Sequence, residues 1–294
     1  KKSLGETLAK LGDIITLVVN ERYSRHYSLD EVGPEGQLNI ANTKVLVIGA
    51  GGLGCPVLQY LTSAGVGTIG IVDSDFVSLS NLQRQILFNT SDIGELKVKC
   101  AVDKLQAINP EITFNQIPNL VTSLNAFELI ADYDIVVDCT DQIHMRYLLS
   151  DVCAILSKPL VFGAIHKFEG QVSVFNYQDG PNYRDLYPNP PSPESVPNCN
   201  DVGVLGVLPG IIGVAQANEV LKIIVGYGEV LSGKLWMFNA KNNSSYTVSF
   251  SKREKNSVPQ TKEEIKNTNY IGYCNTEWEI SQSDAKKTQR IKGI

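Results

Sequence analysis

Three glycines set between an apolar strand and an apolar helix constrain the fold of this chain more than any other feature. Gly49, Gly51 and Gly54 form a G-x-G-x-x-G pattern directly after the apolar run 45–48. A continuous apolar run is typical of a parallel strand that is buried on both faces. Apolar side chains then recur at helical spacing over residues 57–61. The segment therefore predicts a strand, a tight glycine turn and a helix.

An acidic residue at the end of the next apolar run completes this pattern. Asp73 follows the predicted strand 68–72 and stands 19 residues after Gly54. Glycines let the backbone approach a phosphate, and the N-terminus of the helix offers unpaired N–H groups. The acidic side chain can accept hydrogen bonds from ribose hydroxyls. The pattern predicts a nucleotide site without distinguishing a dinucleotide from ATP, and the alternative is a tight turn that binds nothing.

The rest of the chain predicts an α/β fold, with a Rossmann-like, mostly parallel sheet, helices on both of its faces and a C-terminal antiparallel portion. Further strands are expected at 135–137, 159–162 and 171–176, and in a hairpin formed by 235–238 and 246–250. Helices are expected near 97–108, 123–131, 142–156 and 203–225. The proline-rich segment 180–200 predicts an extended loop.

Charge and cysteine usage narrow the classes of function. The net charge of −5 argues against non-specific binding to nucleic acid, which needs a basic surface. The six cysteines form no C-x-x-C pair, so we expect a reducing, cytoplasmic location. The uncharged stretches 45–72 and 202–218 contain glycine, proline and polar residues, which predicts buried elements and no membrane span.

The segment after Asp73 is polar and rich in hydrogen-bond donors. Asn81, Arg84 and Lys97 together carry enough donors to neutralise a triphosphate. A nicotinamide dehydrogenase binds one pyrophosphate and has less use for so many donors. A solvated polar loop is the alternative for any one of these residues taken alone.

Three short motifs make the pattern specific. The run VSLSNLQRQ at 77–85, DCTD at 138–141 and EGQ at 169–171 resemble the MoeB/ThiF family of adenylating enzymes, over roughly residues 20–250. The resemblance implies that the chain uses ATP and Mg²⁺ to adenylate the C-terminal glycine carboxylate of a ubiquitin-like sulfur-carrier protein ending in Gly-Gly, with release of pyrophosphate. Such a reaction would feed sulfur transfer to molybdopterin, thiamin or tRNA.

The resemblance also assigns roles to individual residues. The expected nucleotide-binding residues are Gly49, Gly51, Gly54, Asp73, Asp75, Asn81, Arg84 and Lys97. The expected catalytic residues are Arg25, Arg84, Lys97, Asp141 and Cys199, with Asp141 also holding Mg²⁺. Arg25 would reach the ATP bound by a second subunit, which implies a homodimer. Attack of a carboxylate on the α-phosphorus needs no side-chain nucleophile, so positioning and charge stabilisation carry that step.

The chain departs from the family pattern at its zinc site. Many members hold a structural zinc with two C-x-x-C pairs, the first of them in a C-Y-R-C segment. Here that segment reads N-Y-R-D, with Asn182 and Asp185 in place of the cysteines, and 252–258 contains none. Four thiolates are normally needed, so we expect no structural zinc. Gln142 also stands where asparagine is usual, which affects the hydrogen bonds expected near Mg²⁺.

Two features leave the sulfur chemistry open. Cys199 matches the cysteine of a mobile family loop, where it either takes part in acyl or sulfur transfer or is a plain loop thiol. Residues 279–294 resemble the opening of a rhodanese-like module, or are a polar tail. We therefore expect an adenylating domain over 1–251, a linker over 252–278 and a truncated module over 279–294.

Two other functions remain open from the sequence. A nicotinamide dehydrogenase would share the glycine pattern but would leave Asn81, Arg84, Lys97 and Asp141 without a role. A non-catalytic scaffold would bind a ubiquitin-like partner without adenylating it. The lost zinc cysteines permit the scaffold, whereas the retained nucleotide-site residues argue against it. Exchange of pyrophosphate with ATP separates these functions.

Overall fold

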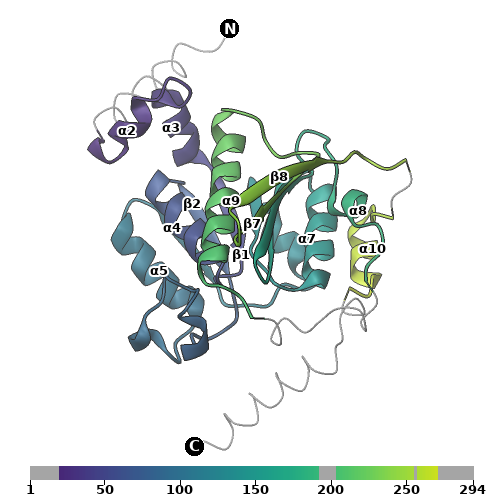
Figure 1. Cartoon of the computed structure of the whole chain (residues 1–294), viewed down its shortest axis with the longest axis horizontal. Helices are drawn as coiled ribbons and strands as arrows, with labels where there is room; N and C mark the ends of the chain where they lie inside the picture. Colours follow the sequence, from purple (N-terminus) through teal and green to yellow (C-terminus); the bar gives the residue numbers. More distant parts are fainter. Residues whose placement is uncertain (1–19, 192–202, 255–256, 271–294) are drawn as a thin grey trace, which may run out of the picture.

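The computed structural model describes residues 20–191, 203–254 and 257–270. Within them the chain forms one eight-stranded sheet with helices on both faces (Figure 1). The strands run in the order β3-β2-β1-β4-β5-β6-β7-β8. Their bounds are β1 (Lys44–Ile48), β2 (Thr68–Val72), β3 (Thr113–Ile117), β4 (Ile135–Asp138), β5 (Leu160–His166), β6 (Glu169–Phe175), β7 (Lys234–Asn239) and β8 (Ser244–Ser249).

The parallel half of the sheet has a point where the strand order reverses. From β1 the chain builds outward to β2 and β3, and then returns to place β4 and β5 on the other side of β1. The register pairs Val45 with Ile69 on one side and with Ile135 on the other. In open α/β sheets, ligands bind beyond the carboxyl ends of the strands at such a point. A ligand site is therefore expected at the carboxyl ends of β1 and β4.

The second half of the sheet is antiparallel. β6 pairs with β5, β7 with β6, and β8 with β7 as a hairpin. The hairpin turn includes Asn243, which takes a positive φ of 54° as turn asparagines often do. The predicted fold class, a mostly parallel sheet extended by an antiparallel portion, is confirmed.

Side chains of each central strand alternate between two apolar cores. In β1, Val45 and Val47 face one core, and Leu46 and Ile48 face the other. The first core is covered by α3 (Gly33–Asn42), α4 (Gly54–Ala64), α5 (Lys97–Ile108) and α9 (Val207–Val225). The second is covered by α6 (Ala126–Ala131), α7 (Ile143–Ile155), α8 (Tyr183–Leu186) and α10 (Lys262–Asn267).

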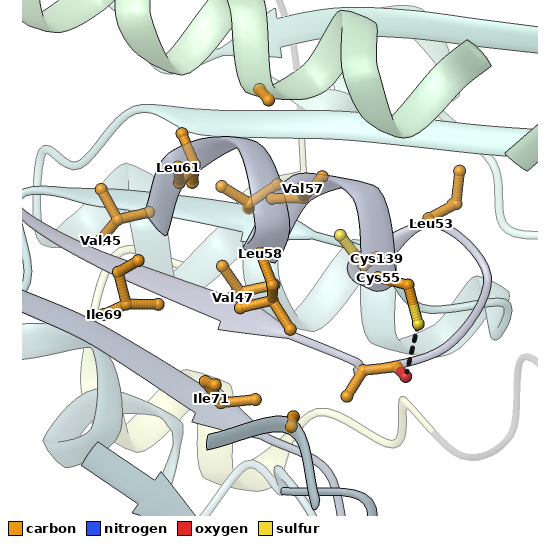
Figure 2. Packing of buried hydrophobic residues seen from close by; sticks show 14 of the residues in the cluster. Val45, Val47, Leu53, Cys55, Val57, Leu58, Leu61, Ile69, Ile71 and Cys139 are labelled. Atoms are coloured by element: carbon orange, nitrogen blue, oxygen red, sulfur yellow. Dashed lines mark hydrogen bonds between the residues drawn. The ribbon is translucent and has the colours of Figure 1, made fainter. Parts of the chain in front are cut away.

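The apolar stripe of α4 anchors the helix on the parallel half of the sheet. Val57, Leu58 and Leu61 are fully buried and pack over β1 and β2 (Figure 2). Burying each such side chain stabilises the fold by about 1.5–3 kcal/mol. This packing fixes the start of α4, and with it the glycine turn that precedes the helix.

Helix α9 is long and apolar enough, by length and composition, to cross a membrane, and among the described residues it is the one helix of this kind. In the fold it packs against α4 and strands β4, β5 and β6 (Figure 1). The contact with α4 is close, because a Cβ atom on Gly213 would lie 2.5 Å from the carbonyl oxygen of Leu53. A core helix has the same composition, and these contacts are those of a core helix.

Several elements were not expected from the sequence. β3 is an edge strand with mostly exposed side chains, so it lacks an apolar run. The segment 180–200 was expected to be an extended loop, which is wrong for residues 183–186 because α8 forms there. Short helices also form before α3, namely η1 (Glu21–Tyr23) and α2 (Ser24–Tyr27), and between β2 and α5, namely η2 (Leu79–Asn81) and η3 (Thr90–Asp92).

The described part of 252–278 is packed onto the domain. Ile265 of α10 is fully buried, and Tyr270 is buried with its hydroxyl donating to Oδ2 of Asp151 at 2.7 Å. Lys262 of the same helix pairs with Glu128 of α6. These contacts tie residues 257–270 to α6 and α7. The boundaries expected at 251 and 278 stay predictions, and residues 279–294 lie outside the described residues.

Candidate functional site

Two of the three glycines are required by the chain itself. Gly49 has a φ of +99°, and a Cβ atom there would lie 2.8 Å from the carbonyl oxygen of Cys139. A Cβ atom on Gly54 would lie 2.0 Å from the carbonyl oxygen of Gly49. Both positions need glycine because the ends of β1 and β4 and the start of α4 meet at this turn.

Gly51 differs, because nothing in the protein requires a glycine there. Its φ is not in the left-handed region, and a Cβ atom would make only an ordinary contact, 3.7 Å from Nε2 of Gln85. The space in front of this residue is therefore open to a ligand. A close approach of backbone to ligand is a common reason for glycine at such a position. The turn has the shape of a phosphate cradle.

Asp73 ties the end of β2 to the glycine turn. Its Oδ2 accepts the N–H of Ala50 and its Oδ1 accepts the N–H of Asp75, each at 2.8 Å. The side chain is only 10% exposed, and burial raises the pKa of this carboxyl despite the opposing effect of Lys97. Each oxygen keeps a further lone pair, so the carboxylate can also accept from ribose hydroxyls.

Lys97 is the first residue of α5, and its side chain is 6% exposed. Its Nζ lies 2.9 Å from Oδ2 of Asp75 and 3.9 Å from Oδ2 of Asp73. Buried lysines are paired in this way because an isolated buried charge is costly. The two carboxylates thus hold a lysine beside the nucleotide turn.

The polar segment after β2 brings Arg84 to the same place. The Cγ atom of Arg84 lies 3.5 Å from where a Cβ atom on Gly52 would be, and Pro209 of α9 lies 3.2 Å from that point. The guanidinium donates from Nη1 to the carbonyl oxygen of Ser80 at 3.1 Å. Asn81 shapes this segment through its carbonyl oxygen, which accepts the N–H groups of Arg84 and Gln85.

Asp141 stands at the neighbouring strand end. It is exposed, and it follows β4 by three residues, where the chain lies against the glycine turn through the contact between Cys139 and Gly49. The carboxyl ends of β1, β2 and β4 therefore bring together the glycine turn and the side chains of Asp73, Arg84, Lys97 and Asp141. This is the edge of the sheet that the topology indicates.

Two other predicted residues are not part of this group. Arg25 is exposed on α2, and no contact among the described residues joins it to the glycine turn or to Lys97. Its role in the site of a second subunit stays a prediction. Cys199 lies outside the described residues. The four cysteines of the described ranges are free and buried, and Figure 2 shows two of them, Cys55 and Cys139. Burial raises the pKa of each of these thiols, that of Cys55 to about 12.

Three residues at the site were given no role from the sequence: Gln216, and Asp138 and Thr140, which lie within the DCTD motif. Asp138 is fully buried at the end of β4, and its Oδ1 accepts both the N–H and the Oγ1–H of Thr140. Gln216 of α9 donates from Nε2 to the carbonyl oxygen of Asp138 at 2.8 Å. A carboxylate that ends a fully apolar strand was a visible signal for Asp138. Gln216 carried no signal, because it comes from a distant helix.

The donor set fits Mg²⁺. Among residues 20–191, 203–254 and 257–270, no group of three or more His, Cys, Asp or Glu side chains is arranged around a common metal position. Mg²⁺ does not need one, because it commonly binds through one or two carboxylates, waters and substrate phosphates. The exposed carboxylate of Asp141 beside a phosphate cradle meets that requirement.

The zinc-ligand positions are occupied by a different arrangement. Oδ1 of Asn182 accepts the N–H groups of Arg184 and Asp185, and Oδ2 of Asp185 accepts the N–H of Asn182. Oδ1 of Asp185 accepts the N–H of Arg253, whose Nε donates to the carbonyl oxygen of Asp185 at 2.7 Å. The side-chain oxygens of both residues are committed to these hydrogen bonds, so they do not fit a zinc site.

The chain matches the model of the ThiF family over residues 23–260. It is 48% identical over 225 residues to the sulfur carrier protein adenylyltransferase of Thermus thermophilus, covering 75% of this chain and 83% of that protein. It is 51% identical over 223 residues to the adenylyltransferase and sulfurtransferase MOCS3 of Culex quinquefasciatus, covering 76% of this chain and 51% of that protein. The chain thus spans about half the length of the MOCS3 relative.

Solved structures share the fold. Escherichia coli MccB crystallised with ATP has a TM-score of 0.72 at 21% identity, covering 84% of this chain and 78% of that chain. The microcin C7 biosynthetic enzyme MccB in complex with N-formylated MccA has a TM-score of 0.73 at 21% identity, covering 82% of this chain and 75% of that chain. At this identity the likeness establishes the architecture alone.

Proposed function

The chain belongs to the ThiF family, and we propose that it is an ATP-dependent adenylyltransferase whose substrate is the C-terminal glycine carboxylate of a ubiquitin-like sulfur-carrier protein. The relative from Thermus thermophilus is named as a sulfur carrier protein adenylyltransferase, and 83% of its length is covered. The observation that carries the proposal is the convergence of Lys97, Arg84 and Asp141 on an open glycine turn.

The residues present support each part of the reaction. The glycine turn at Gly51 receives the phosphates, and Asp73 accepts from the ribose. The attacking carboxylate forms a bond to the α-phosphorus while the bond to the β-phosphate oxygen breaks, and pyrophosphate leaves. Lys97 and Arg84 place positive charge where negative charge develops on the phosphates. Asp141 would hold Mg²⁺, which when bound neutralises phosphate charge.

The alternative functions find less support at this site. A dehydrogenase needs no lysine or arginine beside the glycine turn, and here both are placed there. A scaffold that only binds a partner needs no buried Lys97 held between two carboxylates. Buried ion pairs carry a desolvation cost, and a role in charge stabilisation accounts for keeping this one.

The remaining expectations stand as part of the proposal. The enzyme is a homodimer in which Arg25 completes the site of the other subunit, uses Mg²⁺, carries no structural zinc and works in the cytoplasm without nucleic acid or membrane partners. Cys199 and a rhodanese-like module beyond residue 279 would serve a sulfur-transfer step. Mixing inactive Arg25→Ala with inactive Asp141→Ala subunits tests the shared site, because one site per mixed dimer would be intact. No recovery after demonstrated subunit exchange contradicts it.

Direct detection of the product tests the main proposal. The protein is incubated with ATP, Mg²⁺ and candidate carriers that end in Gly-Gly, and the carriers are examined by intact mass spectrometry. We expect one carrier to gain a mass of one AMP, and the same carrier without its last glycine to gain none. If none of the carriers is modified while ATP binds, the scaffold function replaces the enzyme.

A further inference from the structure

We propose that Asp138 is a positioning residue, whose buried carboxylate holds Thr140 and thereby sets the place of Asp141. The inference rests on the proposed function, because it assigns a role in presenting the carboxylate that would hold Mg²⁺. Asp138 itself is fully buried and does not reach the ligand space.

The side chain of Asp138 forms a compact turn with Thr140. Oδ1 accepts the N–H of Thr140 at 2.9 Å and its Oγ1–H at 2.7 Å. Aspartate side chains that bind the backbone two residues on form such turns and fix the direction of the chain. Since Asp141 is the next residue, the direction of its Cα–Cβ bond depends on this turn.

The backbone before Thr140 is held from two sides. Nε2 of Gln216 donates to the carbonyl oxygen of Asp138 at 2.8 Å, and Gln216 is itself fully buried. The N–H of Cys139 donates to the carbonyl oxygen of Ile48 at 2.9 Å. These bonds leave residues 138 and 139 little freedom, and the two bonds from Thr140 to Asp138 extend that restraint to the residue directly before Asp141.

The charge of Asp138 is balanced from helix α7. Arg146 lies in the same core, its guanidinium 5.4 Å from the ring centre of Phe162, and it interacts electrostatically with Asp138. Among the described residues, Oδ2 of Asp138 and Nε of Arg146 have no hydrogen-bond partner. The hydrogen bonds that the Asp138 side chain accepts within the described residues are therefore those of the turn at Thr140, and both go to Oδ1.

A pair of substitutions at Thr140 isolates the turn. Thr140→Val keeps the volume and removes the hydroxyl donor, whereas Thr140→Ser keeps the donor. Binding of ATP in the presence of Mg²⁺ is measured by calorimetry, together with the Mg²⁺ concentration that half-saturates pyrophosphate exchange and the melting temperature. We expect Thr140→Val to raise the Mg²⁺ requirement and weaken Mg²⁺-dependent ATP binding by about three- to tenfold, the loss of one hydrogen bond. We expect Thr140→Ser to keep a Mg²⁺ requirement and an affinity for ATP close to those of the wild type.

Asp138 provides the second comparison, should Thr140→Val fold poorly. Asp138→Asn keeps an oxygen that accepts from Thr140, and Asp138→Ala keeps none. We expect Asn to retain the wild-type Mg²⁺ dependence more closely than Ala. The inference is overturned if Thr140→Val binds Mg²⁺ and ATP as the wild type does. It is also overturned if Asp138→Asn and Asp138→Ala need equally raised Mg²⁺ concentrations. If the wild type binds ATP with Mg²⁺ but exchanges no pyrophosphate with any carrier, the proposed function fails while the binding comparison still decides this inference.

Discussion

The ammonium group of Lys97 lies 2.9 Å from Oδ2 of Asp75, and the two residues hold together the end of β2 and the start of α5. The lysine is 6% exposed, whereas the side chain of Asp75 is 64% exposed. The aspartate is therefore free to release the lysine to a phosphate, while the lysine stays beside the glycine turn. The pair keeps a cation beside the glycine turn.

Replacing this lysine should remove charge stabilisation without unfolding the protein. We expect Lys97→Met to slow pyrophosphate exchange by about 10²–10³, the usual cost of losing one such contact. Lys99 lies two residues along the same helix and pairs on the surface with Glu95, so Lys99→Met is the matched control and should exchange at the wild-type rate. Equal rates in both variants would contradict the role of Lys97.

The glycine turn offers a comparison between ligand and fold. Gly51→Ala should weaken ATP binding by about 1–3 kcal/mol, because its methyl group makes only an ordinary contact with Gln85 and otherwise enters the open space at the turn. Gly54→Ala should instead cost about 3 kcal/mol or more of folding stability, because its methyl group meets the carbonyl oxygen of Gly49. Calorimetry with ATP and thermal melting separate the two effects. A Gly51→Ala variant that binds ATP normally would show that no phosphate approaches the turn there.

The hydrogen bonds of Asp185 should stabilise this part of the fold, where many family members hold a zinc ion. Asp185→Ala removes the acceptor for Asn182 and Arg253 and should destabilise the fold by about 1–3 kcal/mol. Glu229→Ala breaks an exposed ion pair with Lys234 and should change the melting temperature much less than Asp185→Ala does. Chelator should leave the wild-type melting temperature unchanged. One equivalent of tightly held zinc in protein purified without chelator would refute this account.

Asp138 should make stability depend on pH. Burial raises the pKa of this carboxyl above its ordinary value of 3.8, so the folded state binds the proton more tightly than the unfolded state. The favourable contribution of Asp138 to the free energy of unfolding is therefore complete in acid, and it is lost as the pH rises through the raised pKa. The stability of Asp138→Asn relative to wild type should rise as the pH increases above the ordinary carboxyl pKa of 3.8. A stability difference between Asp138→Asn and the wild type that stays constant with pH would contradict this prediction.

The elements that the sequence predicted are those whose apolar pattern is strong. β1, β2, β4 and β5 are buried on both faces and read as apolar runs, whereas the edge strand β3 is polar and was missed. α8 is four residues long and depends on the cap formed by Asn182 and Asp185, where the sequence predicted only an extended loop.

The candidate site divides in the same way. The glycines and Asp73 follow from local spacing, since turn, helix and strand are contiguous in the chain. Gln216 reaches the end of β4 from a helix 78 residues further on, and Arg253 reaches Asp185 across 68 residues. Such contacts depend on how distant elements pack, and one sequence without a fold does not contain them. Arg25 needs a second subunit for its predicted role, which a single chain does not provide.

Carrier-dependent exchange of labelled pyrophosphate into ATP tests the central claim most directly, because reversible adenylation of the carrier produces it and binding of ATP or carrier alone does not. We expect the wild type to exchange label when Mg²⁺ and a carrier ending in Gly-Gly are present, and not when the carrier lacks its last glycine. Arg84→Ala and Asp141→Ala should remain folded and lose about 10²–10³ of that rate. Wild-type exchange in both variants, or none in the wild type with any carrier, would contradict the account.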